Sequence, residues 1–83
     1  MTIGEILQDI HGLDERLRQL EQKYELLSGD MYTLYRLGEF EQSKDLIRWV
    51  GYYELRRERQ QTYSDFNMLR QSAAQTLLPL PAS

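Results

Sequence analysis

Apolar side chains recur through the first 27 residues at spacings that alternate strictly between three and four. The repeat consists of Ile3, Ile6, Ile10, Leu13, Leu17, Leu20, Tyr24 and Leu27. This spacing places all of them along one side of a helix and is typical of a helix packed lengthwise against another helix. Most of the intervening residues are charged or carry amides, so the other side of this helix faces water.

A similar repeat lies in the second half of the chain. It consists of Tyr52, Leu55, Arg59, Thr62, Phe66, Leu69 and Ala73. No proline, the strongest helix breaker, interrupts residues 44–71. Folding the first helix back antiparallel on the second brings the two repeats together, with Ile6 opposite Phe66 and Leu17 opposite Leu55.

Arg59 is the one charged member of the second repeat, and it falls opposite Leu13 in this pairing. An arginine can cover an apolar neighbour with its aliphatic stem while its guanidinium reaches an acid. We therefore expect the Arg59 head near Asp9 or Asp14. The first 45 residues carry ten acids and five bases and the remainder five bases and three acids, which favours either folding the two halves together or recruiting a partner to each end.

The segment between the two repeats contains signals that end and start helices. Ser28 and Gly29 interrupt the first helix, and Ser28 is a candidate N-cap for a short helix whose apolar face includes Met31. Gly38 can end that helix in a left-handed conformation. Ser43 is the best N-cap candidate for the second long helix.

These elements predict an all-α fold, an antiparallel helical hairpin with a short helix in the connection. Residues 1–75 form its single domain, and residues 76–83, which contain Pro79 and Pro81, form a Leu/Pro tail. A chain of 83 residues buries a modest share of its surface. We therefore expect two copies to assemble as a dimeric helical bundle.

The residue types argue against several functional classes. The chain has no cysteine, and the only histidine, His11, with Asp14 and Glu15 beside it, falls short of a zinc signature. Because nucleophile motifs and phosphate loops are also missing, we expect no enzyme, cofactor or metal site. The N-terminus lacks the basic region of a secretory signal, and no run approaches the roughly 20 apolar residues that cross a bilayer. We expect a cytoplasmic protein without membrane contact.

Six of the nine aromatic residues lie between Met31 and Tyr53. Aromatic rings at helical spacing often close a core, but tyrosine and tryptophan also dominate protein interfaces. The number of rings exceeds what closing one end of a hairpin requires. We therefore expect a partner-binding surface formed by Tyr32, Tyr35, Phe40, Trp49 and Tyr53.

Three arginines follow this segment and form the one basic patch with aromatic neighbours. Phosphate contacts combined with base stacking are a recurrent mode of RNA binding, so Arg56, Arg57 and Arg59 are candidate RNA-binding residues. The net charge of −3 argues against a general nucleic-acid binder, and the acidic first helix can neutralise the patch internally.

The connection also resembles a known family pattern. Its most specific part is Gly38–Glu54, which reads GEF…D…W-x-G-x-YE. The full set of matching residues is Lys23, Tyr24, Met31, Tyr32, Tyr35, Gly38, Glu39, Phe40, Asp45, Trp49, Gly51, Tyr53 and Glu54. These residues resemble, without gaps, small bacterial and archaeal proteins that look like antitoxin components of two-gene toxin–antitoxin loci, beside a small nuclease-like toxin.

This resemblance covers about residues 3–70 and implies a function. A member of this family binds its cognate toxin and blocks it, and the aromatic connection is the natural docking surface. One departure from the pattern is Glu25, which replaces a glycine that would end the first helix sharply, so that helix is expected to run on. We therefore predict a non-enzymatic, antitoxin-like protein-binding module; the alternatives are a small RNA-binding helical bundle and a homo-oligomeric assembly subunit.

Overall fold

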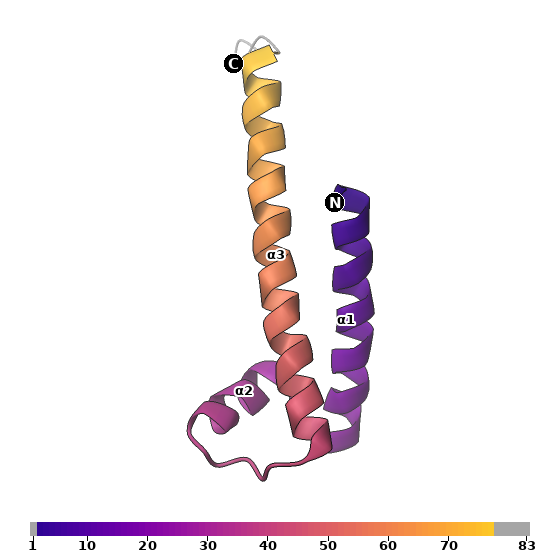
Figure 1. Cartoon of the computed structure of the whole chain (residues 1–83), viewed down its shortest axis with the longest axis vertical. Helices are drawn as coiled ribbons and strands as arrows, with labels where there is room; N and C mark the ends of the chain where they lie inside the picture. Colours follow the sequence, from indigo (N-terminus) through magenta and orange to yellow (C-terminus); the bar gives the residue numbers. More distant parts are fainter. Residues whose placement is uncertain (1, 78–83) are drawn as a thin grey trace.

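The computed structural model describes residues 2–77, with side chains as far as Gln71. Three helices follow in order: α1 (Ile3–Tyr24), α2 (Ser28–Arg36) and α3 (Lys44–Leu77). Helices α1 and α3 lie side by side and run in opposite directions, and α2 lies against the beginning of α3 (Figure 1). The predicted all-α hairpin with a short helix in its connection is therefore confirmed. Of the tail expected at residues 76–83, residues 78–83 lie outside the described part.

Helix α1 begins with Thr2 as its N-cap and ends at Tyr24. The Thr2 hydroxyl oxygen accepts a hydrogen bond from the Glu5 backbone N–H at 3.2 Å, which satisfies a donor that the first turn leaves free. At the other end, Glu25 adopts the left-handed conformation, with φ 51° and ψ 45°. The Leu26 N–H then donates to the Glu21 carbonyl at 3.1 Å. The expectation that α1 runs on was wrong, because Glu25 itself takes the conformation that glycine usually provides.

The caps of α2 and α3 follow the sequence signals in part. Gly38 has φ 72°, and the Glu39 N–H donates to the Leu34 carbonyl at 2.9 Å, so Gly38 ends α2 as predicted. Ser43 caps α3, because its Oγ accepts from the Leu46 N–H at 3.1 Å. Ser28 is not the N-cap of α2 but its first residue.

The core is concentrated at the end of the hairpin where all three helices meet. It joins α1, α2 and α3 through five buried side chains: Leu17, Met31, Leu46, Trp49 and Val50. Farther along α1, the predicted repeat continues into the hairpin seam, where Ile6, Ile10 and Leu13 are each at most 8% exposed. The α1 repeat therefore forms one wall of the hairpin along most of its length.

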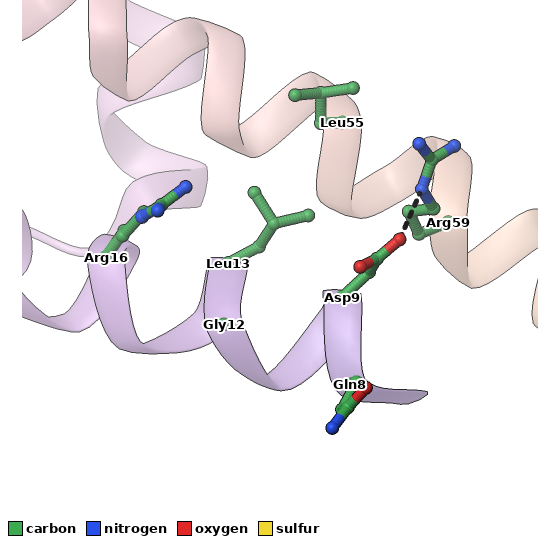
Figure 2. Close-up of a pocket in the computed structure, with 7 residues that line it drawn as sticks. All are labelled: Gln8, Asp9, Gly12, Leu13, Arg16, Leu55 and Arg59. Atoms are coloured by element: carbon green, nitrogen blue, oxygen red, sulfur yellow. Dashed lines mark ion pairs between the residues drawn. The ribbon is translucent and has the colours of Figure 1, made fainter. Parts of the chain in front are cut away.

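The α3 face turned toward α1 differs from the predicted one. Leu55, expected opposite Leu17, lies instead across a groove from Leu13 (Figure 2). Phe66 and Leu69 remain 38% and 70% exposed. Helix α3 is thus shifted and turned relative to the predicted pairing, and part of its apolar repeat faces away from α1.

Two arginines take part in the α1–α3 contact, Arg59 as predicted and Arg56 in addition. Arg56 Nε pairs with Asp14 Oδ1 at 2.8 Å, and Arg59 Nε pairs with Asp9 Oδ2 at 3.3 Å. Their stems cover the seam while their heads reach acids on α1. The expected contact between the Arg59 head and Asp9 is confirmed (Figure 2).

Candidate functional site

Trp49 lies in the core rather than on a binding surface. Its side chain is fully buried, and its ring stacks on Tyr24 at a centroid distance of 5.5 Å. Phe40, which is partly buried, meets the Trp49 ring edge to face at 6.1 Å. The prediction that Trp49 contacts a partner is therefore corrected: burial within the chain leaves no part of its ring accessible.

A buried hydrogen-bond chain fixes α2 against the two long helices. The Trp49 Nε1–H donates to Ser28 Oγ at 2.8 Å. The Ser28 hydroxyl and backbone N–H both donate to Glu21 Oε2, at 2.7 and 2.8 Å. Each polar group thus has a partner, which a buried site requires. The chain takes one residue from each helix and sets where α2 lies.

Three of the predicted surface residues gather on α2 and the adjoining part of α3. The Tyr32 ring lies 4.8 Å from the Tyr53 ring and 6.0 Å from the Tyr35 ring. The Arg57 guanidinium lies 5.9 Å from the centroids of both Tyr32 and Tyr53, and that of Arg36 lies 6.0 Å from Tyr32. We call these five residues the tyrosine–arginine surface. The sequence analysis missed Arg36, because only the position of α2 brings it to the rings.

The surface is open to solvent and is bordered by two hollows. Tyr35 is 39% exposed, and both Arg36 and Arg57 are exposed. A hollow of about 380 Å³ beside Tyr32 and Arg57 is also lined by Glu54, Glu58 and Gln61. A second hollow, of about 420 Å³, extends past Tyr53 to the exposed Leu27. Together these features form a binding area of aromatic, cationic and apolar parts.

The three candidate RNA-binding arginines do not form one patch. Arg56 and Arg59 point toward α1 and pair with Asp14 and Asp9. Arg57 alone joins the tyrosines. Two of the three positive charges are therefore compensated within the chain.

A separate polar cluster closes the tip of the hairpin. Asp45 Oδ2 accepts hydrogen bonds from Lys23 Nζ at 2.5 Å and from the Tyr24 hydroxyl at 2.6 Å. These bonds hold the pKa of Asp45 below its usual range, with Lys23 the larger cause. The same bond from Lys23, together with the negative charge of Asp45, raises the pKa of Lys23. The cluster joins α1 to the first turn of α3. Asp45, one of the residues that carry the sequence resemblance, therefore has a structural role here.

Within the described residues, no group of His, Asp and Glu side chains is arranged to hold a metal ion. None of the helices there is both long and apolar enough to cross a membrane. Comparison with known proteins found no match to this chain among family models, curated sequences or solved structures.

Proposed function

We propose that the chain is a non-enzymatic, cytoplasmic protein-binding module of antitoxin type, which binds a cognate toxin protein through the tyrosine–arginine surface. Tyrosine and arginine are two of the three residue types most enriched where interface energy concentrates. The observation that carries the proposal is the placement of Arg57 against two tyrosine rings on an open face. Both rings are partly buried and pack against the core around Trp49, whereas Tyr35 and Arg57 are exposed.

The acids beside the tyrosine–arginine surface suit basic groups on a partner, and Arg36 and Arg57 within the surface suit acidic ones. The chain has a net charge of −3, and Glu54 and Glu58 line the hollow beside Arg57. A nuclease-like toxin presents cationic side chains to its nucleic-acid substrate, and acids beside the tyrosine–arginine surface complement such a face. The toxin as partner rests on the family resemblance of Gly38–Glu54.

The test is co-purification with the product of the neighbouring gene, followed by a measured dissociation constant. Tyr35→Ala and Arg57→Ala each remove an exposed member of the surface, and we expect each to weaken binding about 30-fold, the effect of a 2 kcal/mol interface residue. Gln22→Ala changes an exposed α1 residue outside the surface and serves as the matched control. Wild-type affinity in both surface variants would refute the proposal.

RNA binding is the alternative function outside protein–protein recognition. One contact still supports it, that of Arg57 with the rings of Tyr32 and Tyr53. Its diagnostic is a steep loss of affinity for single-stranded RNA as salt rises, since arginine–phosphate contacts release counterions. We expect only weak binding without such a dependence. A steep dependence that Arg57→Ala abolishes would favour RNA over the toxin.

A further inference from the structure

An exposed apolar stripe runs along α3 outside the core, and Leu55 within it borders the groove against α1. Its large members are Ile47, Leu55, Phe66 and Leu69, which are 66%, 42%, 38% and 70% exposed. Gly51 and Thr62 fill the positions between them, so successive members are three, four or seven residues apart. These spacings describe one face of a helix suited to packing on another helix. We call these six residues the outer stripe.

The far end of α3 extends beyond the cover of α1. Antiparallel continuation from the Asp9–Arg59 pair places Ile3, the first residue of α1, beside Asp65. Helix α3 continues to Leu77, past the end of α1 (Figure 1). A single helical segment of about 12 residues is marginally stable in water. Phe66 and Leu69 lie at this end of α3. The rest of the chain does not cover their apolar surface, which is therefore available to a neighbouring molecule.

We propose that the outer stripe binds a second copy of this chain, with the α3 helices of the two copies packed parallel. Helical positions place acids along one border of the stripe and bases along the other. The acids are Glu54 and Asp65, and the bases are Arg48 and Arg70; Glu58 falls within the stripe, and Arg59 is paired with Asp9.

The direction follows from these borders. In a parallel pair the acidic border of each helix faces the basic border of the other, and the charges attract. In an antiparallel pair each acidic border faces the other acidic border and each basic border the other basic border, and the charges repel. Asp65 and Arg70, five residues apart, are spaced as charge partners across a parallel pair. The flanking charges therefore favour the parallel arrangement. They also make the stripe complementary to the same stripe on a second copy of the chain.

A groove beside the stripe provides the rest of the contact. It has a volume of about 330 Å³ and is lined by Gly12, Leu13 and Arg16 of α1 and by Leu55 and Arg59 of α3. In Figure 2, Leu13 and Arg16 point toward α3, and Gly12 leaves the α1 surface low. A Cβ added at Gly12 would meet nothing within 4 Å, so a second helix has room to approach.

The area of contact decides whether the groove has to participate. A 23-residue stripe is about 35 Å long and a helix about 10 Å wide, which gives a footprint of about 350 Å² per copy. A stable dimer buries roughly 500 Å² or more per copy. The α3 helix of the second copy must therefore also lie in the groove against α1, and the dimer is a four-helix bundle.

Single cysteines test this arrangement directly, because the chain has none of its own. We would introduce Leu55→Cys, Thr62→Cys and Leu69→Cys separately and oxidise each protein under mild conditions. In a parallel pair every stripe position faces its own copy, so all three variants form disulfide-linked dimers. Gln22→Cys, which is exposed on α1 outside the stripe, forms no disulfide-linked dimer and is the matched control.

Other cross-linking patterns overturn the proposal. Cross-linking at one stripe position only would indicate an antiparallel pair. No cross-linking, with protection of the stripe cysteines by the neighbouring gene's product, would assign the stripe to the toxin. Sedimentation equilibrium adds an independent measurement: Leu55→Glu should raise the dimer dissociation constant at least tenfold, equivalent to about 1.4 kcal/mol. A wild-type chain that sediments as a monomer also refutes it.

Discussion

Glu25 ends α1 in a conformation that favours glycine, so Glu25→Gly should stabilise the protein. A left-handed backbone costs an L-residue about 1–2 kcal/mol, and Glu25 has φ 51° and ψ 45°. Glycine avoids this strain but loses more backbone freedom on folding, at a cost of about 0.5–1 kcal/mol. The expected net gain in the free energy of unfolding is about 0.5–1 kcal/mol, equivalent to a midpoint increase of about 2–8 °C.

Thermal unfolding followed by far-UV circular dichroism, at one fixed chain concentration, measures this gain. The concentration must be fixed because self-association raises the apparent stability. Glu25→Ala is the control for charge, since it removes an acid near the negative end of α1 but keeps the Cβ strain. Gly38→Ala is the converse control: its φ is 72° with open space around the added Cβ, so it should lose about 1 kcal/mol. If Glu25→Gly is no more stable than Glu25→Ala, the strain argument is wrong.

Three further changes probe the core and the tip. Ser28→Ala should cost about 2 kcal/mol in urea unfolding, because the buried Trp49 N–H loses its acceptor; a cost below 0.5 kcal/mol would mean that water replaces it. Leu17→Ala should cost about 2–5 kcal/mol by the same assay, since Leu17 joins α1 to the core; a surface-like loss would contradict that placement. Because the pKa of Asp45 is lowered in the folded chain, its contribution to stability is present above the unfolded carboxyl pKa of about 4 and is lost as the pH falls through the lowered folded value. Asp45→Asn should therefore flatten the acid limb of a stability–pH curve, and an unchanged limb would exclude the Lys23 contact as its source.

The α1 repeat predicted the burial of most of its members, whereas the α3 repeat predicted its contacts with α1 only in part. On α1 the apolar positions are consistent and polar residues lie on either side, so one face is favoured. On α3 the repeat is mixed: Arg59 contacts α1 as predicted, whereas Arg56, which lies outside the repeat, also enters the contact. Counting apolar residues favours a contact through Leu55 and Phe66, but Arg56 and Arg59 turn toward α1 because Asp14 and Asp9 are available to them. That choice depends on two helices at once and is invisible within either repeat.

The aromatic segment shows a similar limit. Its composition indicated both a core and a binding surface. It did not indicate which rings lie in the core and which lie on the surface. Trp49 is buried because α2 folds over it through Ser28, while Tyr35 stays exposed on the outer side of α2. Arg36 and Arg57 lie 21 residues apart in the chain and meet around Tyr32 only after α2 is placed.

The hydrogen-bond chain from Glu21 through Ser28 to Trp49 has a consequence for how a partner could discriminate among forms of this protein. Because α1 supplies the acceptor that orients Ser28, a chain cut between Glu21 and Ser28 would retain the three tyrosines of the tyrosine–arginine surface yet display them without defined geometry. A partner selecting the assembled arrangement would thereby ignore copies that have lost α1, so recognition itself serves as a check on the integrity of the molecule.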